Sequence, residues 1–216
     1  MEIAAVIFDM DGVLTDSEAL INEAAIAMFA ERGIAVSPSD FRPFIGMGED
    51  RYIGGVAAAH HVSIDVAAAK RRTYELYFGL ARERLRAYPG AVELVRACRD
   101  GGLRVALASG GDRVRVNVNL ESIGLPALTW DAVVAAEDAA RKKPAPDLFL
   151  AAARALRVPP RACAVIEDAV NGVRAAKAAE MRCVAVAQTF PPAELTDADR
   201  VRERIADVTL EDLRGS

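Results

Sequence analysis

Two aspartates follow the first apolar run of the chain and stand two positions apart. Asp9 and Asp11 come directly after Ala4–Phe8, which we interpret as a buried strand, and Gly12 allows a tight turn behind them. Residues two apart on an extended strand point the same way, so one carboxylate could act as a nucleophile and the other as an acid or base beside it. An Asp-Gly pair is also a common turn signal, but a turn does not explain a charged Asp9 at the end of a buried strand.

A second group of residues could hold an anion. Ser109 and Gly110 follow the run Leu103–Ala108, and a helix is expected to begin near Asp112, so a hydroxyl and backbone amides could form an anion pocket there. Lys143 lies on a proline-rich turn, and its point charge suits a phosphate and a carboxylate nucleophile together. Each signal is weak alone, because a Ser-Gly-Gly loop and a solvated lysine are both ordinary surface features.

Another pair of carboxylates, Glu167 and Asp168, ends the run Ala162–Ile166. Carboxylates that converge on one sheet edge repel each other unless a cation or a proton lies between them. Mg²⁺ fits such a place because it prefers oxygen ligands and is usually held by one or two carboxylates, waters and a substrate phosphate. Asp168 could instead only cap the helix that follows. The pattern therefore indicates a magnesium site at the carboxyl end of the strands.

The elements that would position these residues alternate from about residue 90 onward. Short apolar runs closed by polar residues or Gly indicate strands, and the periodic patterns between them indicate helices. This alternation predicts an α/β fold with a parallel sheet covered by helices on both faces. The expected strands are Ala4–Phe8, Leu103–Ala108, Ala132–Ala135, Ala162–Ile166 and Cys183–Val186. The expected helices are Gly90–Asp100, Asp112–Ile123, Asp147–Leu156 and Asn171–Ala179.

Residues 16–87 break this alternation. They read as several helices without a strand run, the longest being Ser17–Arg32 and Asp65–Arg86. We therefore expect an α/β core made of residues 1–15 and 88–216, with a helical cap inserted after the first strand.

The cap contains a glycine-rich loop that begins with Gly46 and Met47. Its residues Gly48, Glu49 and Arg51 are expected to close over the site and to set specificity. Arg51 could contact a second anionic group of a substrate, or it could only pair with acidic neighbours at a helix start.

Composition excludes several classes of protein. The 216 residues carry 27 basic and 31 acidic side chains, so a strongly basic nucleic-acid-binding protein is not the first interpretation. No apolar run approaches the roughly 20 residues that a membrane-spanning helix needs, and the beginning of the chain resembles no targeting segment. A natural precursor could still carry a presequence. The three cysteines are expected to be buried, reduced thiols.

The four polar segments occur in order at four successive strand ends, and their joint pattern is far more specific than any one of them. It resembles the haloacid dehalogenase (HAD) superfamily, whose four motifs match Asp9–Gly12, Ser109, Lys143 and Glu167-Asp168. The KPAPD and IEDA runs are similar to the β-phosphoglucomutase-like branch. The resemblance covers nearly the whole chain and implies a Rossmann-like parallel-sheet core with an inserted helical cap.

The resemblance also implies a role for each residue. Asp9 would attack phosphorus and form an aspartyl-phosphate, while Asp11 would protonate the leaving oxygen and later activate water. Ser109, the Gly110 amide and Lys143 would hold the phosphate oxygens.

The same resemblance implies a Mg²⁺ cofactor and its ligands. The ion would be held by the Asp9 carboxylate, the Asp11 backbone carbonyl and Asp168, with Glu167 close by or one shell further out. The expected partner is a small phosphorylated substrate, with neither nucleic acid nor membrane.

Departures from the family pattern separate the alternatives. Asp11 argues against the dehalogenase and phosphonatase branches, which lack that second aspartate. Sugar phosphomutases of this branch carry a cap histidine where Ile21 stands here, and the cap lysine for sugar phosphates is missing near Tyr77. A Mg²⁺-dependent phosphatase acting on a small metabolite is therefore predicted, and a phosphomutase is the alternative.

A third possibility is a HAD module with a regulatory or interaction role. The cap run 44–57 and the segment Ala178–Cys183 are similar to the HAD domain of a multidomain, photoprotective plant chloroplast protein. The chain could then be one domain of a larger parent or a free-standing relative. The expected location is the chloroplast stroma if the source is a plant or alga, and the cytoplasm otherwise.

Overall fold

The structure is a computed structural model, and it describes residues 2–44 and 48–215. The chain divides into two compact units. One consists of Met1–Asp16 together with Arg86–Ser216, and the other is Ser17–Leu85. The first unit contains the sheet, while the described part of the second is helical. The role of residues 16–87 as a functional cap remains a prediction.

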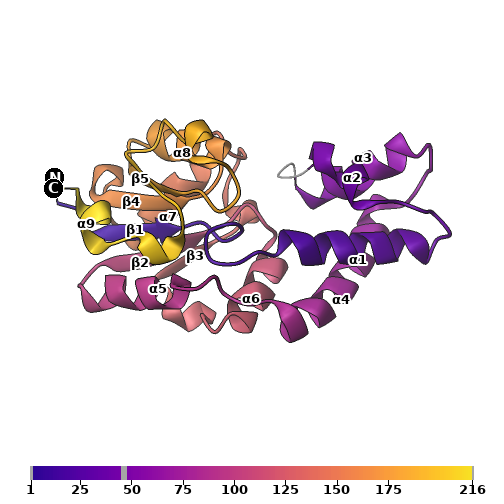
Figure 1. Cartoon of the computed structure of the whole chain (residues 1–216), viewed down its shortest axis with the longest axis horizontal. Helices are drawn as coiled ribbons and strands as arrows, with labels where there is room; N and C mark the ends of the chain where they lie inside the picture. Colours follow the sequence, from indigo (N-terminus) through magenta and orange to yellow (C-terminus); the bar gives the residue numbers. More distant parts are fainter. Residues whose placement is uncertain (1, 45–47, 216) are drawn as a thin grey trace. The chain divides into compact units, whose positions relative to one another are not determined.

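The first unit is built on a six-stranded parallel sheet in the order β3-β2-β1-β4-β5-β6 (Figure 1). The strands are β1 Ala5–Phe8, β2 Arg104–Ala108, β3 Ala132–Val134, β4 Cys163–Glu167, β5 Arg182–Val186 and β6 Arg200–Arg202. β1 lies between β2 and β4, and its last residue, Phe8, is opposite Leu107 and Ile166. The carboxyl ends of these three strands therefore meet at the same edge.

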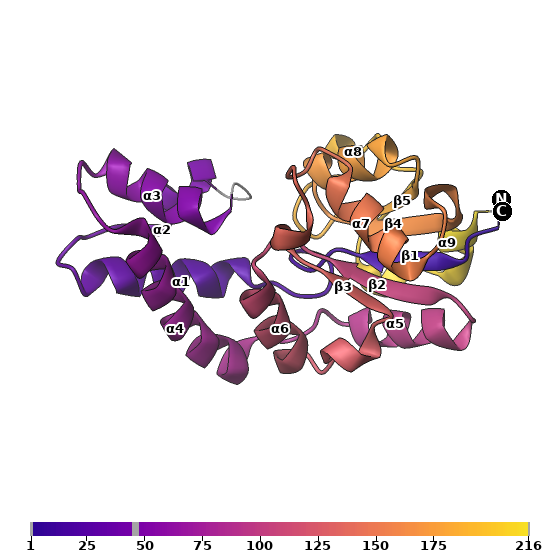
Figure 2. The same cartoon turned by 180° about the vertical axis from the view of Figure 1, so that it is seen from behind.

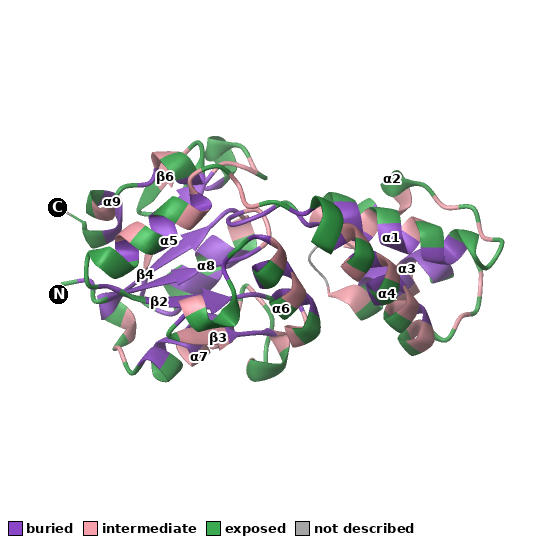
Figure 3. Cartoon of the chain, turned by 90° about the horizontal axis from the view of Figure 1, so that it is seen from below, coloured by how far each residue is buried: buried purple, intermediate pink, exposed green. Residues whose placement is uncertain are grey.

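Helices cover both faces of the sheet, as the alternation of elements predicts. α7 (Asp147–Leu156) and α8 (Val170–Ala178) pack on one face, and α5 (Ala91–Asp100) and α9 (Leu210–Arg214) on the other (Figures 1 and 2). α6 (Arg113–Ser122) follows β2. β1 is buried along its whole length, which fits the continuous apolar runs expected of a parallel sheet. Figure 3 shows that the neighbouring strands β2 and β4 are also largely buried.

The second unit contains α1 (Glu18–Ala30), α2 (Pro38–Phe41), α3 (Glu49–Ala59) and α4 (Val66–Arg84). α1 and α4 pack along each other, and a cluster of buried aromatic side chains joins the remaining helices to them. The Phe41 ring lies 6.1 Å from Phe29 and 4.7 Å from Tyr52, centroid to centroid. The Tyr52 hydroxyl accepts a 2.7 Å hydrogen bond from Asn22.

The chain leaves and re-enters the sheet-containing unit at neighbouring points. The backbone N–H of Tyr88 donates to the Leu14 carbonyl at 2.8 Å. The buried Thr15 hydroxyl donates to the Arg86 carbonyl at 2.6 Å. These bonds tie together the two connections that flank residues 17–85.

The expected elements agree with the structure to within one or two residues at most ends. β6 is the strand that the sequence analysis missed, because its three residues read Arg-Val-Arg and form a half-exposed edge of the sheet. The three cysteines are free and buried, as expected. None of the described helices has both the length and the apolar character that a membrane crossing requires.

Candidate active site

The predicted site residues of the sheet-containing unit gather at the carboxyl edge of the sheet. Asp9 follows β1 and its N–H donates to the Ile166 carbonyl at 3.0 Å. Ser109 follows β2 and its N–H donates to the Val134 carbonyl at 3.0 Å. Glu167 is the last residue of β4. The backbone hydrogen bonds thus continue one residue beyond β1 and β2, and this fixes the positions of Asp9 and Ser109 at the sheet edge.

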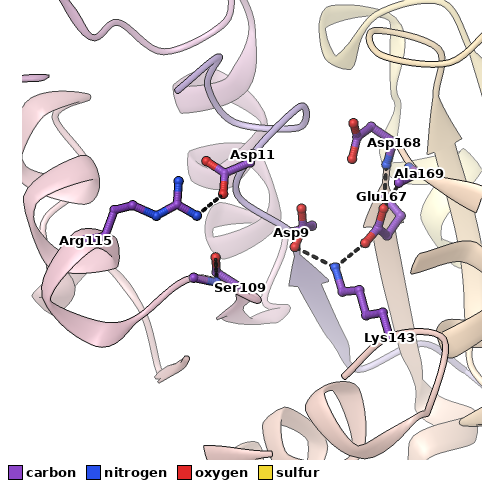
Figure 4. Close-up of polar contacts among 9 residues, drawn as sticks. Asp9, Asp11, Ser109, Arg115, Lys143, Glu167, Asp168 and Ala169 are labelled. Carbon is purple, nitrogen blue, oxygen red and sulfur yellow. Dashed lines mark hydrogen bonds and ion pairs between the residues drawn. The ribbon is translucent and has the colours of Figure 1, made fainter. Parts of the chain in front are cut away.

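A largely buried ion pair lies at the centre of the site. The Lys143 ammonium is 2.7 Å from Oδ1 of Asp9 and also donates to Oε1 of Glu167 (Figure 4). Burial alone would lower the pKa of Lys143, but the charges of Asp9 and Glu167 outweigh it and raise that pKa above its usual range. Lys143 therefore stays cationic in the site.

Both oxygens of Glu167 are engaged by the protein itself. Oε1 accepts from Lys143, while Oε2 accepts from the backbone N–H groups of Asp168 and Ala169 at 2.8 and 2.9 Å. A methyl group on Gly172 would lie 1.8 Å from Oε1, so the glycine makes room for the carboxylate. Glu167 is therefore placed to anchor Lys143 and the start of α8.

Three buried carboxylates could hold a metal ion. Oxygens of Asp9, Glu167 and Asp168 all lie within 4.8 Å of one another. Burial raises the pKa of Asp9 to about 7, and burial together with the charges of Glu167 and Asp9 raises the pKa of Asp168 to about 8. One lysine does not neutralise this cluster. The donor set is hard oxygen, so the site fits a divalent cation such as Mg²⁺.

The loop after β1 approaches Asp168 closely. Gly12 adopts a φ of 79°, and a methyl group there would lie 1.9 Å from Oδ2 of Asp168. Only glycine meets both the backbone conformation and the contact without strain. The Asp-Gly signal in the sequence thus has a steric reason, which is the close approach of Asp168 at the end of the neighbouring strand β4.

The expectation that Asp9 and Asp11 point the same way is wrong. β1 ends at Phe8, so the two aspartates lie beyond the extended strand. Their carboxylates point apart: Asp9 faces Lys143, and Oδ2 of Asp11 accepts a 2.9 Å bond from Nη2 of Arg115 (Figure 4). Arg115 belongs to α6 and is buried.

The anion-binding residues predicted after β2 differ in exposure. Ser109 is buried, and its hydroxyl oxygen accepts a 3.1 Å bond from the Gly111 N–H. Gly110 is exposed, and a side chain there would meet nothing within 4 Å. The loop is therefore compact at Ser109 and open at Gly110, as an anion pocket at the strand end requires.

Two residues after β5 also support the site, and the sequence analysis missed them. Gln188 donates to the Gly12 carbonyl at 2.8 Å and accepts from the Ile205 N–H at 2.8 Å. Thr189 forms a side-chain hydrogen bond with Asp168. Their position just beyond the end of β5 was the one signal in the sequence that could have indicated a place in the site.

The predicted cap residues lie in the other unit. Gly48, with a φ of 86°, precedes α3, and Glu49 and Arg51 belong to the first turn of that helix. Asp50 pairs with Lys70 at 3.3 Å. Gly46 and Met47 lie outside the described residues. Closure of this loop over the site remains a prediction.

Comparison with known proteins agrees with this geometry. The haloacid dehalogenase-like hydrolase family matches residues 3–180. The chain is 46% identical over 217 residues to Protein SUPPRESSOR OF QUENCHING 1, chloroplastic, of Arabidopsis thaliana, and covers 21% of that protein and 98% of itself. It is 32% identical to hexitol phosphatase B of Escherichia coli, covering 99% of this chain and 98% of that protein.

The fold also has solved relatives. A crystal structure of mutant CbbY from Rhodobacter sphaeroides in complex with xylulose-(1,5)bisphosphate superposes with a TM-score of 0.88 at 28% identity. The match covers 98% of this chain and 99% of that one.

Proposed function

The chain belongs to the haloacid dehalogenase-like hydrolase family, and from that premise we propose that it is a Mg²⁺-dependent phosphatase that hydrolyses a small phosphorylated metabolite through an aspartyl-phosphate on Asp9. The observation that carries the proposal is the buried Lys143–Asp9 pair at 2.7 Å, beside Ser109 and the acidic cluster. A lysine that contacts a carboxylate nucleophile lessens its repulsion of an anionic substrate and can also bind the transferred phosphate.

The first step transfers the phosphoryl group to the enzyme. An oxygen of Asp9 forms a bond to phosphorus, and the bond between phosphorus and the leaving oxygen breaks with its electron pair on that oxygen. Asp11 donates a proton to the leaving oxygen, so an alcohol departs and Asp11 becomes a carboxylate. Ser109, the Gly110 N–H and Lys143 would hold the other phosphate oxygens.

The second step regenerates the enzyme. Asp11 accepts a proton from a water molecule, whose oxygen bonds to phosphorus while the bond to Asp9 breaks, and inorganic phosphate leaves. Asp9, Asp168 and the Asp11 backbone carbonyl would hold Mg²⁺, with Glu167 one shell further out. The ion supplies positive charge beside the transferring phosphoryl group.

We propose a sugar phosphate as the substrate class. The relatives that cover nearly the whole chain include a hexitol phosphatase and a protein crystallised with a sugar bisphosphate. Gly48, Glu49 and Arg51 would select the substrate from the cap. A mutase is disfavoured because Ile21, where the mutases carry a histidine, is apolar and buried.

The test is phosphate release in the presence of Mg²⁺ across sugar phosphates, nucleotides and an aryl phosphate. We expect release by the wild type and none above background by Asp9→Asn, with both proteins folded. Full turnover by Asp9→Asn would refute the covalent mechanism. Removal of Mg²⁺ with EDTA should abolish the release and added Mg²⁺ should restore it.

A second candidate is a HAD module within a larger protein. The 46% identity to the Arabidopsis protein extends over 98% of this chain but only 21% of that relative. A regulatory or interaction role in photoprotection would follow from such a parent, together with a location in the chloroplast stroma. A folded protein that binds Mg²⁺ but releases phosphate from no compound would favour this candidate.

A further inference from the structure

Helix α6 presents two buried polar side chains to the loop after β1. Arg115 contacts Asp11 through Nη2 at 2.9 Å from Oδ2. One helical turn later, Nδ2 of Asn119 lies 3.3 Å from the sulfur of Met10. Arg115 is 8% exposed and Asn119 is fully buried. Residues four apart share one face of a helix, so this face is aimed at the segment that carries the proposed acid.

The burial of this guanidinium needs an explanation. Neighbouring positions of α6 that only pack, such as Val116 and Leu120, are apolar, and an unpaired buried charge would cost several kcal/mol. The loop before the helix also makes room for Arg115, because a methyl group on Gly111 would lie 2.6 Å from its Nη2. The fold thus buries Arg115, gives it a carboxylate partner and leaves space for it beside Gly111, so the contact with Asp11 is a specific one.

We infer that Arg115 is a positioning residue that orients the carboxyl group of Asp11 for proton transfer, an inference that rests on the phosphatase function proposed above. A guanidinium can only donate hydrogen bonds. The Asp11 oxygen that it contacts must therefore be an acceptor, and the transferable proton must sit on the other oxygen, Oδ1. Arg115 thus decides both the direction of the carboxyl group and which oxygen carries the proton.

The consequence that can be measured separately concerns the first step. As Asp9 bonds to phosphorus, the electron pair of the breaking bond passes to the leaving oxygen, which takes the proton from Oδ1 of Asp11. Asp11 is left as a carboxylate that still accepts from Arg115 through Oδ2. An alkoxide leaving group needs this proton, whereas a nitrophenolate leaves readily without it. Misplacing Asp11 should therefore slow the two classes of substrate unequally.

The experiment measures kcat/KM of the Mg²⁺-loaded protein for benzyl phosphate and p-nitrophenyl phosphate. Because kcat/KM covers steps up to the transfer to Asp9, it reports on the proton donation to the leaving group. Arg115→Met should lower kcat/KM for benzyl phosphate about 10- to 100-fold and that for p-nitrophenyl phosphate less than about 3-fold, as expected for loss of part of a general-acid contribution. Arg115→Lys should recover part of the loss, because it restores a donor.

Two controls separate positioning from simple damage. Arg113→Met alters a half-buried arginine of the same helix, which contacts Asp138 and the Val133 carbonyl rather than Asp11, and should leave both values unchanged. In the double variant Asp11→Asn, Arg115→Met, the loss should be no greater than in Asp11→Asn alone. If Arg115→Met fails to fold, the Lys variant carries the comparison of the two substrates.

Equal losses on both substrates, no loss on benzyl phosphate, or additive losses in the double variant would overturn the role of Arg115 while leaving the phosphatase function in place. Absence of phosphate release by the wild type from both compounds and from the metabolite panel would overturn the phosphatase function, and this inference with it.

Discussion

Replacing Lys143 by Met should destabilise the metal-free protein, and the penalty should grow with pH. The ammonium is 2.7 Å from Asp9 and also binds Glu167, whose side chain is 1% exposed. Removing one partner from a buried ion pair leaves an uncompensated charge and typically costs about 3–5 kcal/mol. We expect a loss of this size at pH 8.5.

The pH dependence follows from the sign of the carboxylate shifts. Burial raises the pKa of Asp9 to about 7 although Lys143 opposes the shift, so Met at position 143 should raise this pKa further. A raised acid pKa means that the native state binds more protons than the unfolded state, so stability falls as pH increases. At pH 6 Asp9 keeps its proton in both native proteins. Above about pH 7 the wild type releases this proton and its stability stops falling, whereas the variant still holds the proton and continues to lose stability up to pH 8.5. At about 1.4 kcal/mol per pH unit, the penalty at pH 6 should be roughly 2 kcal/mol smaller.

Urea unfolding in EDTA at the two pH values measures this difference. Lys142→Met is the matched control, because Lys142 is exposed, and it should cost less than about 0.5 kcal/mol. Adding Glu167→Gln to Lys143→Met removes a buried charge and should recover stability at pH 8.5. A Lys143→Met protein as stable as the control, or a penalty that does not change with pH, would refute the electrostatic reasoning.

Three further outcomes are expected. Mg²⁺ should bind more weakly at pH 6 than at pH 8 and release protons on binding, because burial raises the pKa values of Asp9 and Asp168 to about 7 and 8. Calorimetry in buffers of different ionisation enthalpy measures the affinity and the proton release, and an affinity that does not change with pH would contradict Asp9 and Asp168 as the metal ligands. Gly12→Ala should lower thermal stability by about 1–3 kcal/mol and abolish phosphate release, because its φ is 79° and the methyl group meets Asp168; an unchanged melting temperature would count against the steric argument. Asp212→Asn should lower the free energy of unfolding by about 1–2 kcal/mol at pH 7, because hydrogen bonds from Arg202 lower the pKa of Asp212 to about 2. This contribution to stability is present above pH 4 and is lost as pH falls towards 2, so a variant that is still less stable than the wild type by the same amount at pH 2.5 would refute this explanation.

The cluster of charged residues at the strand ends could be predicted from the sequence, because residue type and position along the chain are enough to indicate it. A charged residue such as Asp9 or Glu167 that ends an apolar run must lie at the edge of the sheet. Parallel order then brings successive strand ends together. The structure places Lys143 in contact with both carboxylates, although the sequence shows only a lysine on a proline-rich turn.

The support for Asp11 could not be predicted in the same way. Arg113 and Arg115 are two positions apart on α6, and nothing in the sequence distinguishes one from the other. Arg113 is half-buried and Arg115 is buried against Asp11, and only the rotation of the helix against the loop separates them. The prediction that Asp11 points the same way as Asp9 was wrong for a related reason. β1 ends at Phe8, so the alternation of side chains along a strand no longer applies to Asp9 and Asp11.

The paired connections at Leu14–Tyr88 and Thr15–Arg86 bear on how this protein could change during evolution. The two segments that flank residues 17–85 are hydrogen-bonded to each other. Residues 17–85 therefore form an insertion whose two ends meet at one place. Closing such a loop depends only weakly on its length, at about 0.6 kcal/mol for each doubling. Segments of quite different size could therefore be exchanged at this junction without disturbing the register of β1. Selection could thus alter this insertion while Asp9, Ser109 and Glu167 stay in place at the strand ends.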